Sequence, residues 1–305
     1  MAYVTICGTV EQRSANMAAA VASGVPRLQT IGGYHRNKAS IVAFGPSLKE
    51  TWREIQGPIF TVGGAHDFLV NKGILPTFHV EIDVREHKAD MVTPVVGVRY
   101  LIASCCHPVW WSKLADFDVS YWHVLSADGW EMEWIAKNDP GGLISAFGGG
   151  STAGQRAMTV AAMLGYRDFD VFGIDFCYSG SETHAAEHSG PEQKRTRARV
   201  GDEVFETSPE LAQAAVEMRN FLRTADCQVR FHGEGMMQSI ARAIQKETKQ
   251  NGTARSRMDK RSMDGGDQGQ DGGGRQGQHS RQRDGACGHH AQSLGNAPDA
   301  QGIAD

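Results

Sequence analysis

The stretch GGGSTAGQRAMTVAAMLGYRDFDVFGID, residues 148–175, contains a glycine turn, a helix and a strand in immediate succession. Ser151 or Thr152 can cap the first turn of the helix, and Gly165 stands where a helix commonly ends in a left-handed residue. Apolar residues recur at helical spacing at Ala153, Ala157, Val160, Ala161 and Leu164. The apolar run at 169–175 then predicts a buried strand. The stretch therefore predicts the helix and second strand of a βαβ unit.

Seven further apolar runs have the length and composition of strands. They lie at 39–45, 58–64, 77–83, 98–104, 119–125, 142–148 and 227–233. Helix-length segments lie between or after them at 65–73, 208–225 and 235–250. A parallel strand pair needs a crossover connection, which is usually a helix, so this alternation favours a mostly parallel sheet with helices on both faces. The sequence predicts an α/β, Rossmann-like fold.

Composition and charge narrow the class of protein. The chain has 305 residues, of which 40% are apolar and 22% charged, and its net charge is −4. It lacks the basic excess that binding a nucleic acid backbone requires. No apolar run approaches the roughly 20 residues that span a bilayer, and the first residues lack the features of a signal peptide. We expect a cytoplasmic protein with no nucleic acid or membrane partner.

The sequence divides into three regions. Residues 1–37 are interpreted as an N-terminal extension, 38–250 as the Rossmann-type domain and 251–305 as a disordered tail. The last region holds 12 of the 36 glycines, and no aromatic residue follows Phe231. Such a segment buries too little apolar surface to offset the entropy lost on ordering. Its CGHH sequence at 287–290 could bind a metal ion only loosely.

Three glycine turns follow predicted strands, and in open α/β sheets ligands bind beyond the carboxyl ends of the strands. The turn residues are Gly45, Pro46, Ser47 and Leu48, then Gly63 and Gly64, and then Gly149, Gly150, Ser151 and Thr152. Glycines let the backbone approach an anion, and the dipole of a following helix favours negative charge. Each turn alone is equally consistent with an ordinary chain reversal. Together they predict a phosphate site, although none matches the dinucleotide-binding or P-loop fingerprint.

Two acidic residues close predicted strands at the same edge. Asp83 ends the 77–83 run and Asp175 ends the 169–175 run. A carboxylate at such a position can bind Mg²⁺ or a ribose hydroxyl, and the alternative is a carboxylate that caps a loop or helix. Asp83 and Asp175 are therefore the candidate metal ligands.

Three blocks of the sequence, at 41–48, 63–83 and 148–185, resemble in their order and spacing the 6-hydroxymethylpterin diphosphokinase MptE-like family. That fold group includes the motility-accessory-factor flagellin glycosyltransferases and looks similar to bacterial sialyltransferases. The resemblance implies a Rossmann-like domain whose glycine turns contact a nucleotide. The chain departs from the family pattern at Val62, which precedes Gly63 and Gly64 where Asn or Ser is usual.

The resemblance also implies an activity, a nucleotide-dependent transfer of diphosphate from ATP to a pterin-type alcohol. Transfer of a sugar from a nucleotide-sugar, and a non-catalytic nucleotide-binding module, are the alternatives. In the transferase hypothesis Mg²⁺ on Asp83 or Asp175 orients the nucleotide, and His184 takes the proton of the acceptor. His184 and Asp175 are thus the candidate catalytic residues. The expected partners are a small-molecule nucleotide and its acceptor.

Other motifs compete with this interpretation. Residues 184–188 read H-x-x-E-H, a zinc-peptidase pattern, but flanking glycine and proline leave little room for the helix that aligns the two histidines. Trp110 and Trp111 could stack on a flat ligand, although paired tryptophans favour a place in the core. The basic run at 194–199 is predicted to be a loop that is either solvated or closes over a polyphosphate.

Overall fold

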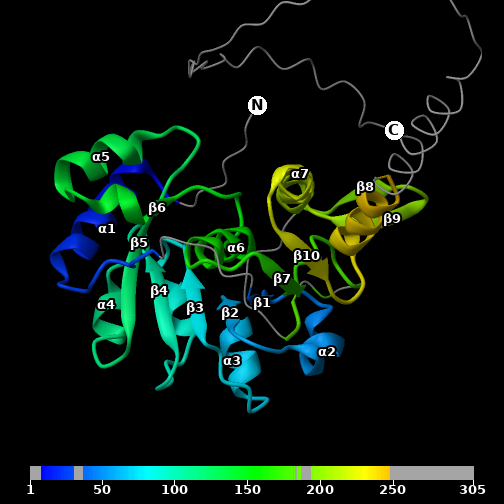
Figure 1. Cartoon of the computed structure of the whole chain (residues 1–305), viewed down its shortest axis with the longest axis horizontal. Coiled ribbons are helices and arrows are strands. Elements are labelled where there is room, and N and C mark those ends of the chain that lie inside the picture. Colours follow the sequence, from blue (N-terminus) through cyan, green and yellow to red (C-terminus); the bar gives the residue numbers. More distant parts are fainter. Residues whose placement is uncertain (1–7, 31–36, 181, 183, 187–193, 248–305) are drawn as a thin grey trace, which may run out of the picture. The chain divides into compact units, whose positions relative to one another are not determined.

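The computed structural model describes residues 8–30, 37–180, 182, 184–186 and 194–247. Within these, eight parallel strands form one sheet in the order β10-β7-β1-β2-β3-β4-β5-β6 (Figure 1). The strands are β1 Lys38–Val42, β2 Ile59–Val62, β3 Phe78–Glu81, β4 Arg99–Ala103, β5 Val119–Val124, β6 Ala146–Phe147, β7 Asp168–Phe172 and β10 Gln228–Phe231. Six of them lie inside predicted apolar runs, and β1 and β7 overlap theirs but begin one residue earlier, at Lys38 and Asp168. The predicted strands and their parallel arrangement are therefore confirmed.

Helices connect most of the strands. They are α1 Val10–Ala22, α2 Leu48–Thr51, α3 Ala65–Val70, α4 Val109–Lys113, α5 Trp130–Asn138, α6 Ala153–Met163 and α7 Pro209–Thr224. Residues 236–247 are also helical. Three short 3₁₀ segments complete the set, η1 Trp52–Glu54, η2 Glu86–Met91 and η3 Gly142–Ser145. None of the described helices is long and apolar enough to cross a bilayer.

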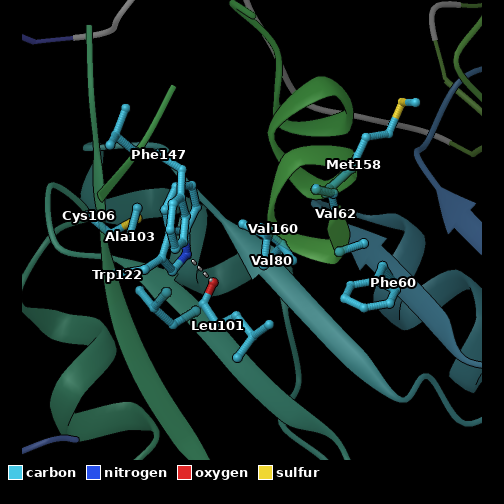
Figure 2. Close-up of a cluster of buried hydrophobic side chains, with 14 of the residues drawn as sticks. Phe60, Val62, Val80, Leu101, Ala103, Cys106, Trp122, Phe147, Met158 and Val160 are labelled. Atoms are coloured by element: carbon cyan, nitrogen blue, oxygen red, sulfur yellow. Dashed lines mark hydrogen bonds between the residues drawn. The ribbon is translucent and has the colours of Figure 1, made fainter. Parts of the chain in front are cut away.

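Both faces of the sheet are covered, as predicted, because successive residues of its buried strands point to opposite sides. In β1, Ile41 packs into the large core cluster with Val160 of α6, while Val42 packs with Leu69 of α3. Figure 2 shows the first of these faces, where the side chains of β2 and β3 meet α6. Continuous apolar strands of this kind are the signature of a doubly covered parallel sheet.

Helix α6 forms where the sequence predicts it, and its ends explain why. Thr152 accepts a hydrogen bond from the backbone N–H of Gln155, and the Gln155 side chain bonds back to the N–H of Thr152, which completes a capping box. Gly165, after the helix, has a φ of 95°, which suits glycine. The helix therefore begins directly after the third glycine turn, with its first N–H groups at the carboxyl edge of the sheet.

Residues 8–30, interpreted above as an extension, contribute to the same core. Met17 and Ala20 of α1 and Leu28 after it are fully buried in the large cluster. Arg13 pairs with Glu131 of α5 at 3.0 Å, and both side chains are buried. These residues pack against the β5 side of the sheet rather than standing apart from it.

The prediction of a loop over 194–199 is wrong. Thr196–Val200 forms β8, which pairs in antiparallel fashion with β9, Glu203–Thr207. Ala198, Val200 and Phe205 are partly buried against the core cluster, so alternate side chains of the hairpin face inward. Trp110 and Trp111, in contrast, are buried in the core as favoured above. The predicted tail at 251–305 lies outside the described residues.

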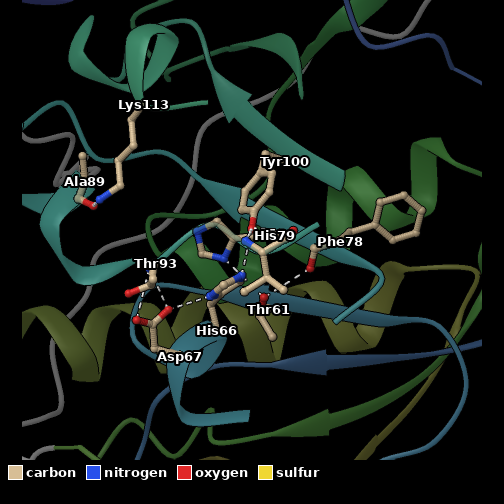
Figure 3. Close-up of polar contacts among 10 residues, drawn as sticks. Thr61, His66, Asp67, Phe78, His79, Ala89, Thr93, Tyr100 and Lys113 are labelled. Carbon is tan, nitrogen blue, oxygen red and sulfur yellow. Dashed lines mark hydrogen bonds and ion pairs between the residues drawn. The ribbon is translucent and has the colours of Figure 1, made fainter. Parts of the chain in front are cut away.

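A polar cluster lies within the face that α3 covers (Figure 3). The Thr61 hydroxyl and the His79 Nδ1 are 3.2 Å apart, and His66 Nε2 lies 3.2 Å from the Tyr100 hydroxyl. His66 Nδ1 lies 2.7 Å from Asp67 Oδ1. Burial lowers the pKa of both His66 and His79, so both imidazoles are neutral at pH 7. None of these residues lines the cleft described below, and we interpret the cluster as part of the scaffold.

Candidate functional site

The strand order reverses at β1, and a cleft lies beyond that point. Strands β1 to β6 follow one another in a single direction, and the chain then returns to place β7 on the other side of β1. Turns that leave a sheet on the two sides of such a switch point diverge, and ligands bind between them. The cleft has a volume of about 350 Å³ and is lined by residues that follow β1, β2, β3 and β7 and by the start of α6.

The cleft brings together residues from all three predicted glycine turns. The predicted site residues that line it are Gly45, Pro46, Gly63, Gly64, Asp83, Gly150, Ser151, Thr152, Asp175 and His184. Ser47 and Leu48 are instead buried below the first turn. Gly149 faces a second cleft on the other side of its turn. The turns thus share one edge and one cavity, while three of the nominated residues lie off it.

Asp175 fixes the first turn in place. Its Oδ1 accepts hydrogen bonds from the Ser47 hydroxyl at 2.6 Å and from Gln238 Nε2 at 3.0 Å. Its Oδ2 accepts one from the Ser47 N–H at 2.8 Å. The side chain is 2% exposed, and burial raises its pKa above the ordinary value despite these bonds. Both oxygens are occupied by protein donors, so this geometry gives the carboxylate a structural role and does not suit a metal ligand.

The glycine of the same turn is explained by close packing. A Cβ at Gly45 would lie 2.5 Å from the Gly173 carbonyl oxygen and 2.6 Å from Asp175 Oδ2. The Gly45 N–H donates to that Gly173 carbonyl at 2.9 Å. The chain after β1 and the chain after β7 are therefore in direct contact, and only glycine fits between them.

Asp83 is also occupied by a protein partner. It accepts hydrogen bonds from Arg85 at three donors, the backbone N–H at 3.0 Å, Nε at 2.9 Å and Nη2 at 2.5 Å. Burial works to raise the pKa of Asp83, but these bonds outweigh it and the pKa lies below its ordinary value. Within the described part of the chain, no group of three or more His, Cys, Asp or Glu residues could hold a metal ion. A preassembled magnesium site is not found there.

Arg156 is a site residue that the sequence interpretation missed. Its side chain, on α6, lines the cleft and is 5% exposed. Nη1 donates to the carbonyls of Leu125 at 3.2 Å and Phe147 at 3.0 Å, yet no carboxylate of the described residues pairs with the guanidinium. Burial lowers the pKa of this group, although an arginine stays charged. Glu131 and Glu217 act on this charge without forming an ion pair with it, and a buried cation that has no direct ion pair favours an anionic ligand.

A signal for Arg156 was present in the sequence. It stands on the apolar face of the predicted helix, three residues after Ala153 and four before Val160. A charged residue on a face that packs against a sheet is unusual. Its meaning becomes clear only in the structure, where no carboxylate of the described residues forms an ion pair with it and Glu131 and Glu217 act on its charge from a longer distance.

Glu81 is the second residue that was missed. It ends β3, lines the cleft and is 4% exposed. Its Oε1 accepts hydrogen bonds from the backbone N–H groups of Ile82 at 2.8 Å and Asp83 at 3.0 Å. Burial raises the pKa of Glu81 to about 7. Lys88, which lines the same cleft, provides a cation on this side.

His184 lies at the cleft, where the sequence interpretation placed it. Its ring is tilted against Phe44, with 5.7 Å between the ring centroids. The neighbouring Ala185 is buried, and its N–H donates to the Phe44 carbonyl at 3.0 Å. Residues 184–186 form a bend, and His188 of the zinc-peptidase pattern lies outside the described residues.

Comparisons with known proteins agree with this architecture. The family model described as 6-hydroxymethylpterin diphosphokinase MptE-like matches residues 14–181. Among solved structures, the MAf glycosyltransferase from Magnetospirillum magneticum AMB-1 is similar, with a TM-score of 0.53 and 15% sequence identity. The match covers 77% of this chain and 41% of that chain, so the present chain spans less than half of that protein, and the likeness shows the fold. A comparison with curated proteins gives no match.

Proposed function

The chain belongs to the 6-hydroxymethylpterin diphosphokinase MptE-like family, and on this basis we propose that it is a transferase that binds a nucleotide in the cleft. The family description names a diphosphokinase, and the similar solved structure is titled a glycosyltransferase. Both names describe transferases that act on phosphate-containing donors. They therefore support the same general class of reaction.

The observation that carries the proposal is the position of Arg156 among the glycine turns. A phosphate in the cleft would give the buried guanidinium a direct ion pair, which no carboxylate of the described residues provides. The N-terminus of the 11-residue helix α6 opens at the same cavity and favours the same charge. A Cβ at Gly63 would meet no atom within 4 Å, so this turn leaves open space at the cleft, whereas a Cβ at Gly64 or Gly150 would meet Phe44 or Gln155. The cleft is thus suited to the phosphates of a nucleotide.

The preferred reaction follows the family description, a transfer of diphosphate from ATP to a pterin-type alcohol. The acceptor oxygen bonds to the β-phosphorus of ATP, the bond from that phosphorus to the oxygen bridging the α-phosphate breaks, and AMP leaves. The proton of the hydroxyl passes to a base of the protein. The alternative, sugar transfer from a nucleotide-sugar, is favoured by the likeness to the glycosyltransferase fold.

His184 is the proposed base, since its imidazole lies at the cleft and a histidine titrates near neutral pH. We expect His184→Gln to lower kcat by about a hundredfold, because removal of a general base typically costs that much, while nucleotide affinity stays within about twofold. The experiment measures kcat and nucleotide affinity for the wild type and the variant, each in the same preparation. A variant with unchanged kcat would remove His184 from this role.

Magnesium enters the proposal only together with the nucleotide. Asp83 and Asp175, the expected ligands, are bound to Arg85 and to Ser47 and Gln238 respectively. The described residues therefore do not fit a resident Mg²⁺ site. Any ion in the cleft would be one carried by the phosphates themselves.

The proposal is tested by a thermal-shift panel of ATP, CMP, UDP and GDP compounds, each with and without Mg²⁺, followed by turnover assays on every compound that binds. Ligands that bind only the native state raise its melting temperature, and at a given concentration a tighter ligand raises it more. The proposal expects at least one compound to stabilise the protein and to be consumed. No shift from any compound contradicts nucleotide binding, and binding without consumption supports the non-catalytic module instead.

A further inference from the structure

A second cleft adjoins the first and is separated from it by the third glycine turn. It has a volume of about 590 Å³ and lies between the end of β5, α6 and α7. Gly150, Ser151 and Arg156 line both cavities. The nucleotide proposal uses the first cleft and leaves the second without a function.

The lining of the second cleft differs chemically from that of the first. Its apolar members include Met158, Met218 and Phe221. Its polar members are mostly uncharged and include Thr159, Gln213 and Asn220. Arg156, at the junction, is its one cation among the described residues, and Glu217 supplies a carboxylate. Such a cavity suits an uncharged molecule with apolar surface and hydrogen-bonding groups, and it does not suit a second polyphosphate.

The junction between the clefts is held in a defined position. Glu217 Oε2 accepts hydrogen bonds from the Ser151 hydroxyl at 2.8 Å and from its N–H at 3.0 Å. A side chain at Gly149, whose φ is 119°, would collide with Thr159 of α6. The turn therefore lies close against α6, and the wall between the two cavities is a glycine backbone.

Arg156 is the second element of the junction. The carbonyls of Leu125 and Phe147 hold its Nη1, and the described residues offer no hydrogen-bond partner to its Nε and Nη2. Because Arg156 lines both cavities, its guanidinium can contact a ligand group from either one. An anionic group bound by Arg156 in the first cleft would thus adjoin a molecule in the second.

We infer that the second cleft is the acceptor subsite, which binds an uncharged alcohol with its hydroxyl directed past Arg156 and Ser151 into the first cleft, where the nucleotide phosphates bind and His184 lies. The inference rests on the proposed function, because it takes its acceptor from a transfer reaction. The inference adds the location of the acceptor and its chemical class. Both depend on α7, which lies beyond residue 181, where the family match ends.

The test uses the full chain and two uncharged probes, 6-hydroxymethylpterin and glucose. Binding of each probe is measured by NMR saturation transfer in the presence of ATP or of UDP-glucose. Asn220→Trp fills the mouth of the second cleft from an exposed position on α7. Arg219→Trp, on the adjacent exposed residue outside the cleft lining, is the matched control. We expect Asn220→Trp to lower the affinity for the probe by about tenfold, while Arg219→Trp leaves that affinity unchanged.

The outcomes separate this inference from the proposed function. Binding of neither probe, or equal binding to wild type and Asn220→Trp, overturns the acceptor subsite. Displacement of the probe by ATP also overturns it, since both ligands would then share one cleft. If no nucleotide binds but Asn220→Trp still weakens a probe, the nucleotide proposal fails while the second cleft stands as a binding site for uncharged alcohols.

Discussion

The two ends of the first cleft differ in how their buried polar groups are satisfied. At the β1 and β7 end, both oxygens of Asp175 accept protein hydrogen bonds, and Gly45 packs against the Gly173 backbone. At the α6 and β3 end, Arg156 forms no direct ion pair and Glu81 accepts hydrogen bonds through only one oxygen in the described structure. Burying a polar group without a partner is costly, so the second arrangement makes sense with a ligand. We therefore interpret the β1 and β7 end, the satisfied end, as scaffold and propose the α6 and β3 end, the unsatisfied end, as the ligand-binding site.

The largest effect is expected from Asp175→Ala, at the satisfied end. The change leaves the buried Ser47 N–H and hydroxyl and the Gln238 amide without their acceptor, which costs about 4 kcal/mol of unfolding free energy. Urea denaturation measures the loss. Asp128→Ala, at an exposed position, is the control and should change stability by less than about 0.5 kcal/mol. A loss under about 1 kcal/mol for Asp175→Ala would mean that the carboxylate is not structural.

A smaller loss is expected from Gly45→Ala. The new methyl group would lie 2.5 Å from a backbone oxygen, so the two strand ends must move apart, at a cost of about 2–3 kcal/mol. Gly148→Ala is the matched control, since no atom lies within 4 Å of a Cβ at that position. Thermal and urea unfolding should show a lower unfolding free energy for Gly45→Ala and an unchanged one for Gly148→Ala. Equal stability of the two variants would contradict the close contact between the turns.

The sequence predicted the scaffold better than the site. The eight strands were found because each carries a short, mostly apolar run of strand length, and α6 was found because its caps and its apolar face agree. Helix α1 was missed because the polar Arg13 and Asn16 are buried on its inner face and weaken its apolar pattern. Arg156 and Glu81 were missed for another reason. Each is a single charged residue within an apolar element, and the absence of a partner is visible only in three dimensions.

At the unsatisfied end, Glu81 should make stability depend on pH. The pKa of its carboxyl is about 7 in the folded protein, against an ordinary value of 4.5, so the folded state binds the proton more tightly. This contribution to stability is complete below pH 4.5 and is lost as the pH rises through 7, by on the order of 3 kcal/mol in total.

Glu81→Gln, which keeps an acceptor for the Ile82 and Asp83 N–H groups, should remove that pH dependence. The unfolding free energies of variant and wild type are measured at pH 5 and at pH 8. The variant should gain stability relative to the wild type between pH 5 and pH 8. An identical difference at the two pH values would show that Glu81 does not titrate in this range.

The central claim, that the unsatisfied end binds an anion, is tested most directly by calorimetric titration of inorganic pyrophosphate into the wild type, Arg156→Gln and the exposed control Arg219→Gln. The account predicts that Arg156→Gln weakens pyrophosphate binding by about 30-fold, near 2 kcal/mol, while Arg219→Gln binds like the wild type. Unchanged affinity in Arg156→Gln, or an equal loss in both variants, would contradict it.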